Sequence, residues 1–298
     1  GAPIVKEKAT RAYGADVRFV GATVDEALVA AKAFAAETGA VLIHPFDHPD
    51  IVAGQATVGL EIIEQCPDVR TIVVSVGGGG LLAGIAVAVK DARPDVRLVG
   101  VQAIGAAAYP PSLDAGRPVP LETMTTMADG IAVACPGDVP FGLVQALCDG
   151  VVTVHEDWLA RALVMLLERA KLVVEPAGAA GVAAVLANSS AFEPPVVVVL
   201  SGGNVDPLLM LRVIRHGLAA SGRYLNFRVR IPDRPGALAQ LLAELAALDA
   251  NVLDVVHERT KAQLHIHEVE VALQLETRGA EHRSRILSAL RKAGHPLS

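Results

Sequence analysis

The sequence predicts an α/β domain built on a parallel sheet, followed by a smaller α+β domain. Three observations indicate this fold class. Apolar strand patterns alternate with helical patterns over residues 1–222, as in proteins made of βα units. Four consecutive glycines join one of these strands to a helix. Beyond Gly222 the strand pattern changes from continuously apolar to alternating, so we place a domain boundary between residues 1–222 and residues 223–298.

The first elements are predicted from short local patterns. Residues 16–20 and 40–43 are expected to be strands, and residues 24–37 are expected to be a helix. A second helix is expected to begin at Pro49-Asp50 and to continue to residue 65, with Asp50 as its N-cap.

The most informative segment is Gly77-Gly78-Gly79-Gly80, which lies between an apolar strand at residues 71–75 and a helix at residues 81–90. Glycines permit positive φ angles and close approach of the backbone. The free N–H groups at the start of a helix favour an anion. The segment is therefore predicted to hold a phosphate. The alternative is a tight turn whose glycines serve packing alone.

Three kinds of phosphate loop compete at this segment. A nucleotide P-loop closes with Lys and Ser or Thr, whereas Leu81, Leu82 and Ala83 stand here. A dinucleotide site requires an acidic residue after the next strand, residues 97–101, but Gln102 follows that strand. The remaining interpretation is a phosphate monoester bound without metal or ribose, such as pyridoxal phosphate.

A second loop supports this interpretation. Residues 194–200 form a β-branched run that is typical of a fully buried strand, and Ser201 follows them. Because ligands bind beyond the carboxyl ends of parallel strands, Ser201 is expected to face the same crevice as the glycines. Its hydroxyl would suit a pyridine nitrogen. The alternative is that Ser201 caps the following helix.

The other elements of the first domain are a connection and two helices. Residues 109–120 are rich in Pro and Gly and are expected to be irregular. Residues 156–171 are predicted to be an amphipathic helix, in which Lys171 complements the negative end of the helix dipole. Gly178 and Gly181 begin a helix whose small residues predict close packing.

Six motifs, in this order, resemble the threonine dehydratase (threonine ammonia-lyase) family, which has a pyridoxal-phosphate-dependent, tryptophan synthase β-like lyase fold. The motifs are His44-Pro45-Phe46-Asp47, Ala53-Gly54-Gln55-Ala56-Thr57, the tetraglycine segment, Ala128-Asp129-Gly130-Ile131, Glu175-Pro176-Ala177-Gly178-Ala179 and Ser201-Gly202-Gly203-Asn204. The resemblance implies a three-layer domain with a parallel sheet. It makes residues 1–43 the remnant of a small lobe and residues 44–222 the large lobe.

The resemblance also implies roles for individual residues and for the cofactor, pyridoxal 5'-phosphate. Ser201 would meet the ring nitrogen, and Glu175 would lie near the cofactor. The cofactor phosphate would be held by the backbone of Gly77, Gly78, Gly79, Gly80 and Leu81.

One family feature does not occur in this chain. The Schiff-base lysine of the family lies in a Ser-Phe-Lys-type segment, well upstream of the tetraglycine loop. None of the lysines here has that context: Lys6, Lys8, Lys32, Lys90, Lys171, Lys261 and Lys292. The segment Gly1–Lys6 resembles family sequence that follows the lysine segment. We therefore expect an N-terminally truncated chain that has no catalytic residue of its own and is inactive alone.

The C-terminal part shows a different order of elements. Strands are predicted at residues 224–231, 251–257 and 265–275. Helices are predicted at residues 237–248 and 281–293. This β-α-β-β-α order is the ferredoxin-like plan with its last strand cut or absent.

The turn after the first of these strands carries a second resemblance. Together with the element order, Asp233-Arg234-Pro235-Gly236-Ala237-Leu238 resembles an ACT domain, a regulatory module that binds amino acids. The resemblance implies an effector site at Asp233, Pro235, Gly236, Ala237 and Leu238. Phe227 and Val229 of the preceding strand are expected to contact a branched effector. The alternative is a dimerisation or linker domain without a ligand.

Four other polar residues are of types that could bind a ligand. His265 and His267 lie on one face of a predicted strand and could share a metal, but no third ligand is evident, so an exposed strand face is favoured and no metal is predicted. His44 is expected to be structural, with Pro45 fixing its turn. Asp129 matches a position near a cation site in some family members, without partner ligands that can be named here.

Composition narrows the function classes. The net charge of −6 argues against a nucleic-acid partner, and no apolar run approaches the length of a membrane span. The chain has three scattered cysteines and no evident signal peptide, so a reducing cytoplasm is expected. A homo-oligomer is also expected.

The sequence therefore predicts pyridoxal-phosphate-dependent deamination of L-threonine to 2-oxobutanoate and ammonia in the full-length enzyme. L-serine is expected to be a poorer substrate, and isoleucine or valine is the expected effector. Two alternatives stay open: a racemase or other β-eliminating enzyme on the same fold, and a non-catalytic amino-acid sensor.

Overall fold

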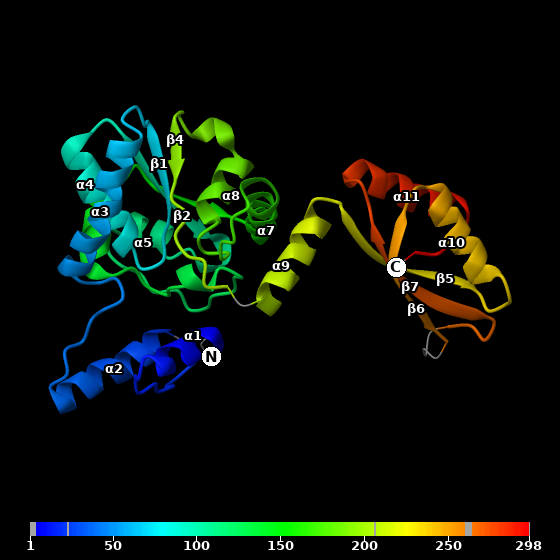
Figure 1. Ribbon diagram of the computed structural model, residues 1–298, viewed down its shortest axis with the longest axis horizontal. Coiled ribbons are helices and arrows are strands. Elements are labelled where there is room, and N and C mark those ends of the chain that lie inside the picture. Colours follow the sequence, from blue (N-terminus) through cyan, green and yellow to red (C-terminus); the bar gives the residue numbers. More distant parts are fainter. Residues whose placement is uncertain (1–3, 23, 206, 260–263, 298) are drawn as a thin grey trace. The chain divides into compact units, whose positions relative to one another are not determined.

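The computed structural model describes residues 4–22, 24–205, 207–259 and 264–297 (Figure 1). The chain divides into two compact units, Gly1–Leu211 and Arg212–Ser298. The division falls within helix α9 (Pro207–Ala220). Among the described residues, no helix combines the length and the hydropathy needed to cross a membrane.

A parallel sheet of four strands forms the centre of the first unit. Its strands stand in the order β3-β2-β1-β4. Their bounds are β1 (Thr71–Ser75), β2 (Arg97–Ala103), β3 (Val151–Val154) and β4 (Val196–Val198). All five residues of β1 are buried. The predicted parallel sheet is therefore confirmed.

Helices cover both faces of this sheet, which makes the predicted three layers (Figure 1). One layer contains α3 (Pro49–Gln65), α4 (Gly80–Ala92) and α6 (Asp138–Leu147). The other contains α7 (Glu156–Met165) and α8 (Ala180–Ala187). The remaining helical segments are α1 (Ile4–Ala12), α2 (Val24–Thr38), α5 (Tyr109–Ala115), a π-helix at Leu166–Ala170, and 3-10 turns at Ile104–Ala106, Asp129–Ile131 and Ser189–Ala191.

Small residues set the spacing between these layers. A Cβ atom at Gly59 of α3 would lie 2.9 Å from the Ile85 carbonyl oxygen of α4. A Cβ atom at Gly181 of α8 would lie 2.7 Å from Val198 of β4. The close packing predicted from the glycines of the α8 segment is therefore present.

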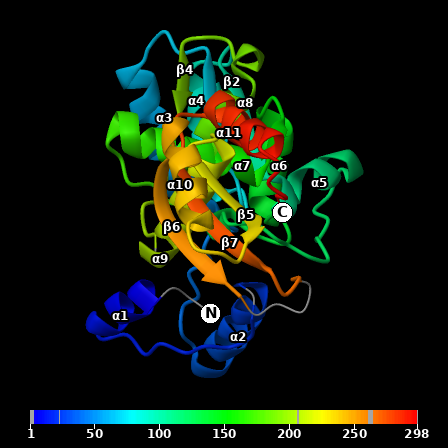
Figure 2. The ribbon, with the colours of Figure 1, turned by 90° about the vertical axis from the view of Figure 1, so that its right-hand side faces the viewer.

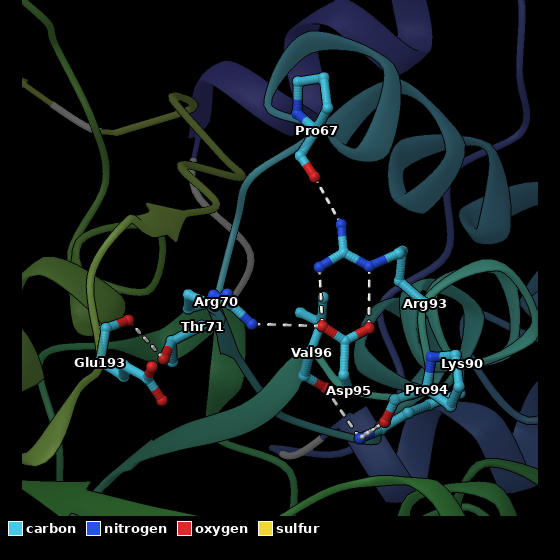
Figure 3. A network of polar contacts seen from close by, with 9 residues as sticks. All are labelled: Pro67, Arg70, Thr71, Lys90, Arg93, Pro94, Asp95, Val96 and Glu193. Atoms are coloured by element: carbon cyan, nitrogen blue, oxygen red, sulfur yellow. Dashed lines mark hydrogen bonds and ion pairs between the residues drawn. The ribbon is translucent and has the colours of Figure 1, made fainter.

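An ion-pair network fixes the end of the sheet opposite the glycine loop (Figure 3). The Arg93 guanidinium donates two hydrogen bonds to the Asp95 carboxylate, at 2.8 and 2.7 Å, and Arg70 lies 3.5 Å from the same group. Nearby, Lys90 donates to the Val96 carbonyl oxygen at 2.8 Å and contacts Asp149 at 3.3 Å. These contacts tie the turn after α4 to the start of β2 and to the segment before β3.

Two predicted strands near the N-terminus are wrong. Residues 16–20 and 40–43 have no strand pairing among the described residues. Phe19 is 54% exposed and Val41 is 90% exposed. A strand is stable only when a neighbouring strand pairs with its backbone, and local pattern alone does not supply that neighbour. The predicted helix at residues 24–37 is confirmed as α2.

Several element ends also differ from the prediction. The N-cap of α3 is His48, whose Nδ1 accepts from Asp50 N, so Asp50 lies in the first turn instead of capping the helix. The predicted helix at residues 156–171 is α-helical only to Met165. Strand β4 is half-buried, not fully buried, because it lies at the edge of the sheet.

Several elements were not predicted, among them α1 and α9. Helix α5 begins with Pro110 and Pro111 near its N-terminus, where proline is tolerated, so part of the connection at residues 109–120 is helical. Helix α6 and strand β3 were not recognised. Strand β3 has only four residues, two of them exposed, and therefore lacks a buried-strand pattern.

The C-terminal unit has the predicted β-α-β-β-α order. Its elements are β5 (Tyr224–Pro232), α10 (Ala237–Ala247), β6 (Asn251–Glu258), β7 (Glu268–Glu276) and α11 (Ala280–Lys292). The strands form an antiparallel sheet in the order β5-β7-β6. Figures 1 and 2 show α10 and α11 on one face of this sheet, where both helices contribute to the apolar core.

Two details of this unit refine the prediction. Val229 forms an isolated antiparallel bridge with Leu297, on the edge of β5 that would receive a fourth ferredoxin-like strand. Strand β7 begins at Glu268, so His265 and His267 lie in the exposed turn before it and not on a strand face.

Candidate cofactor and effector sites

A cavity of about 940 Å³ lies at the carboxyl end of β1 in the first unit. Its volume is within the range of small-molecule sites. Ser201 lines this cavity together with the glycine loop, as expected from their positions after neighbouring parallel strands. The cavity also includes Asp129. The predicted cofactor residues that line it are Gly77, Gly78, Gly79, Gly80, Leu81, Glu175 and Ser201.

The glycine loop presents a row of free backbone donors. Within the described chain, the N–H groups of Gly77, Gly78 and Gly79 have no hydrogen-bond acceptor. The N–H groups of Gly80 and Leu81 belong to the first turn of α4, which lacks intrahelical partners. Five donors next to a helix N-terminus suit a phosphate dianion.

Close neighbours leave no room for a side chain at the glycines of the loop. Gly79 is the N-cap of α4 and has a φ angle of 104°, in the left-handed region. A Cβ atom at Gly79 would overlap the Tyr109 hydroxyl, and one at Gly78 would overlap the Phe46 ring. The absence of side chains at these glycines thus permits close packing against Phe46 and Tyr109 and leaves the loop open toward the cavity. The geometry of these residues is therefore compatible with both interpretations of the sequence, a phosphate loop and a packing turn.

Glu175 lies where two loops approach each other. Its backbone N–H donates to the Gly202 carbonyl oxygen at 3.1 Å. A Cβ atom at Gly130 would lie 2.9 Å from Glu175 Oε1, and a Cβ atom at Gly202 would overlap the same carboxylate. Two of the motifs singled out in the sequence therefore supply the space that the Glu175 side chain occupies.

The loop that carries Asp129 is fixed to α7. Thr126 Oγ1 donates to Glu156 Oε1 at 2.6 Å, and Met127 N donates to Glu156 Oε2 at 2.8 Å. Thr126 also lines the cavity. Glu156 was not predicted as a positioning residue. Its sequence position, at the start of a predicted helix, does not indicate a contact with Thr126, which lies 30 residues earlier.

Ser75 is a second residue that the sequence analysis missed. It ends β1, lines the cavity and is 5% exposed. Its hydroxyl has no hydrogen-bond partner within the described residues. A buried hydroxyl without a partner is costly, so Ser75 is a donor suited to a polar ligand. The sequence feature that could have identified Ser75 is a serine at the end of an otherwise apolar strand, directly before Val76 and the glycine loop.

These observations test whether pyridoxal phosphate fits. Free backbone donors suit the phosphate, and the Ser201 hydroxyl can face the ring nitrogen. The described residues that line the cavity include no lysine. Lys171 instead donates to the Glu168 carbonyl oxygen at 2.6 Å, at the end of the π-helix, which agrees with the structural role predicted for it. The non-covalent parts of a cofactor site are therefore present.

A smaller cavity of about 330 Å³ lies in the C-terminal unit. It is lined by all five predicted effector residues, Asp233, Pro235, Gly236, Ala237 and Leu238. Gly236 is the N-cap of α10 with a φ angle of 87°, and the first N–H groups of that helix have no intrahelical partner. Ile231, His257 and Arg259 also line this cavity but were not predicted.

The apolar wall of this cavity differs from the expectation. Val229 is fully buried, and Phe227 is 7% exposed in the core between the sheet and its helices. Neither residue lines the cavity. Ile231, two residues further along the same face of β5, takes that position with Leu238. Arg259 lies 3.3 Å from Asp233 across the opening.

The comparisons with known proteins identify two domains in the chain. Residues 1–202 match the pyridoxal-phosphate dependent enzyme family, and residues 226–295 match the ACT domain. The L-threonine ammonia-lyase of Geobacter sulfurreducens is 45% identical over 98% of this chain and 73% of its own length. That of Thermotoga maritima is 45% identical over 99% of this chain and 73% of its own length.

Solved structures give the same assignment for the first unit. The processed threonine deaminase isoform 2 of Solanum lycopersicum is 35% identical, with a TM-score of 0.68 over 72% of this chain and 63% of that chain. A second solved threonine deaminase is 41% identical, with a TM-score of 0.64 over 67% of each chain. The chain therefore belongs to the L-threonine ammonia-lyase family of pyridoxal-phosphate dependent enzymes and carries a C-terminal ACT domain.

Proposed function

We propose that the protein deaminates L-threonine to 2-oxobutanoate and ammonia. The observation that carries this proposal is the row of unpaired N–H groups in the glycine loop, which share a cavity with Ser201 and Glu175. The 45% identity to two L-threonine ammonia-lyases over nearly the whole chain supports the choice of substrate.

In this proposal each part of the cavity has its own task. The N–H groups of residues 77–81 hold the cofactor phosphate, and the buried Ser75 hydroxyl is a further donor beside them. Ser201 accepts or donates a hydrogen bond at the ring nitrogen without supplying charge. Glu175 holds the loops at residues 129–131 and 201–203 at a fixed distance. When bound, pyridoxal phosphate supplies the electron sink for loss of the α-proton and the β-hydroxyl.

The printed chain offers no candidate for the amine that would bind the cofactor covalently. Covalent catalysis requires a lysine whose amine reaches the cofactor. The cavity has none among the described residues. We therefore propose that the 298 residues alone do not turn over threonine, and that the reaction is to be assayed on the gene product as the cell makes it.

An assay of that product tests the proposed function. Threonine is expected to yield 2-oxobutanoate and ammonia in equal amounts, and serine is expected to react more slowly. Chiral analysis of the remaining substrate tests the alternative of a racemase. Serine racemases are among the similar structures, one from maize at 33% identity. Binding of an amino acid without any product would instead support the sensor alternative.

We further propose that residues 223–298 regulate residues 1–222 through an amino acid. Isoleucine or valine fits the cavity bounded by Ile231 and Leu238, where the α10 N-terminus and Arg259 would meet a carboxylate. A homo-oligomer in the cytoplasm, without nucleic-acid or membrane partners, completes this proposal. Sedimentation with and without isoleucine would test the assembly.

A further inference from the structure

The turn at His44-Pro45-Phe46-Asp47 is held by one imidazole nitrogen. His44 Nδ1 accepts hydrogen bonds from Asp47 N at 2.8 Å and from Phe46 N at 3.3 Å. The His44 ring also contacts the Phe46 ring edge-on, with centroids 4.8 Å apart. An imidazole nitrogen can accept only while it carries no proton. The turn therefore requires the neutral form of His44, in the tautomer with Nδ1 bare.

Phe46 packs against the glycine loop and lines the same cavity. A Cβ atom at Gly78 would overlap the Phe46 ring, and a Cβ atom at Gly80 would lie 3.1 Å from the Phe46 carbonyl oxygen. The Phe46 side chain and backbone are thus in contact with two of the residues whose N–H groups face the cavity. Since Phe46 packs against the loop, its position affects where those N–H groups point.

Asp47 fixes the other side of the loop. Its Oδ1 accepts from Val139 N at 2.9 Å at the start of α6. Just before this helix, Gly137 N donates to the Gly78 carbonyl oxygen at 3.1 Å. The Gly78 peptide is therefore held between Phe46 and the segment that Asp47 anchors. The turn at residues 44–47 therefore contacts the glycine loop through Phe46 and the start of α6 through Asp47.

We propose that Phe46 is a positioning residue for the phosphate cradle and that neutral His44 holds it in place, so that protonation of His44 loosens the cradle. The expected consequence of this inference, weaker retention of the cofactor, rests on the proposed function. Its structural part concerns the loop alone. Nothing in it requires that Phe46 or His44 touch the reacting atoms.

The charges around His44 favour its neutral form. Burial lowers the pKa of His44, and this is the largest effect. Lys32 on α2 and His48 at the N-cap of α3 lower the pKa further, whereas Asp47 opposes them. The neutral imidazole is therefore stable at neutral pH. As the pH falls below 6.5 and then below the lowered pKa, the hydrogen bonds that fix the turn are lost.

The first test measures the loop without any cofactor. Amide hydrogen exchange is followed for Gly137 and Ala83, whose N–H groups donate to the Gly78 and Gly79 carbonyl oxygens, in the printed chain at about pH 8 and about pH 5.5, after correction for the intrinsic rate. The parent is expected to show protection of these two amides at high pH that falls at least about tenfold at low pH, relative to the amides of β1. His44→Ala should show the low-pH behaviour at both pH values.

Two substitutions separate the parts of the inference. His44→Asn keeps an acceptor oxygen close to the Nδ1 position but does not titrate, so its loop protection should be independent of pH. Phe46→Ala should reduce protection at both pH values, and Phe46→Leu should reduce it less. His265→Asn is the control, because His265 is an exposed histidine of the C-terminal unit that does not line the cavity. It should follow the parent.

The second test measures retention of pyridoxal phosphate by the product of the complete gene after dialysis. Phe46→Leu and His44→Ala are expected to weaken binding by about tenfold or more, and His44→Asn is expected to restore it at about pH 5.5. If the parent bound no cofactor, the proposed function would fail, while the exchange result would still decide the loop inference. Unchanged exchange in Phe46→Leu, or the parent's pH dependence in His44→Asn, would overturn that inference.

Discussion

At the scale of single residues, the missing side chains of the glycines shape the cavity that we propose for the cofactor. Gly78 leaves space for Phe46, and Gly79 leaves space for Tyr109. Gly130 and Gly202 leave space for the Glu175 carboxylate. Each of these is a close approach between segments far apart in the sequence. The site therefore depends on backbone positions at which any Cβ atom would displace a neighbour.

Replacement of Gly78 by valine should both weaken cofactor binding and destabilise the first unit. The added atoms overlap the Phe46 ring, and overpacking of this kind costs about 1–3 kcal/mol. Urea denaturation and cofactor retention measure the two effects. The matched control is Gly142→Ala in α6, where an added Cβ atom meets nothing within 4 Å. Equal stability of the Gly78→Val variant and the parent would contradict the packing role of Gly78.

Replacement of Ser201 by alanine should act on the cofactor ring and leave its phosphate in place. We expect the product of the complete gene to keep its cofactor through dialysis, with a shifted absorption spectrum and a lower turnover of threonine. The reason is that Ser201 lies apart from the N–H groups of the glycine loop on a different strand end. Ser190→Ala, on an exposed 3-10 turn, is the control. An unchanged spectrum would remove Ser201 from the ring site.

At the scale of elements, the helices and strands that were predicted correctly are encoded by their own local sequence patterns. Strands β1 and β2 are continuous β-branched or apolar runs, and the helix after the glycines has no competing pattern. The elements predicted wrongly depend on partners distant in the sequence. Residues 16–20 have a strand-like pattern but no neighbour to pair with among the residues described, and β3 has a neighbour but only a weak pattern.

The turn between α4 and β2 gives a testable pH dependence. Two hydrogen bonds from Arg93, with further attraction from Arg70, lower the pKa of Asp95 from 3.8 to about 2 (Figure 3). The folded state thus favours the carboxylate. The resulting stability is fully present above pH 3.8 and is lost as the pH falls toward 2.

We expect Asp95→Asn to lower the denaturation midpoint at neutral pH and to flatten its acid dependence below pH 3.8. Thermal or urea unfolding at a series of pH values measures both effects. Asp114→Asn is the control, since the Asp114 side chain makes no hydrogen bond or ion pair within the described chain. If both variants showed the same acid dependence as the parent, the Arg93–Asp95 pair would contribute nothing measurable, as many surface pairs do.

At the scale of the whole molecule, the two units hold two separate sites with a common design. In each, a glycine with positive φ caps a helix whose first N–H groups face a cavity: Gly79 before α4 and Gly236 before α10. Both loops could be predicted from the sequence because glycine runs and turn motifs are local. The roles of Phe46, Glu156 and Arg259 could not, because their contacts cross the fold and leave no local pattern.

The printed chain should form no covalent adduct with pyridoxal phosphate and should release no ammonia from threonine. The reason is that no lysine lines the cavity among the described residues. Borohydride reduction in the presence of the cofactor, followed by peptide mass mapping, measures adduct formation. A stoichiometric adduct at Lys171 or Lys90 would refute this expectation. Both amines are engaged elsewhere, at the Glu168 and Val96 carbonyl oxygens respectively.

Isoleucine or valine should bind the C-terminal unit, and calorimetry on the product of the complete gene measures this binding. The carboxylate would meet the first N–H groups of α10, and the branched side chain would contact Ile231 and Leu238. Gly236→Val is the informative variant. Nothing lies within 4 Å of an added Cβ atom there, so the substitution clashes with no neighbour. It should act through the strained φ angle of 87° and through the valine side chain, which would occupy the cavity.

The binding prediction and the regulatory prediction have different tests. An effector changes activity only if it prefers one state of the whole enzyme, so binding without inhibition would limit the role of the unit without removing its site. If coupling exists, isoleucine must weaken threonine binding by the same factor by which threonine weakens isoleucine binding. Titration of each amino acid in the presence of the other measures that factor. No heat from either effector at about millimolar concentration, or equal binding by Gly236→Val, would leave the unit with a role in assembly alone.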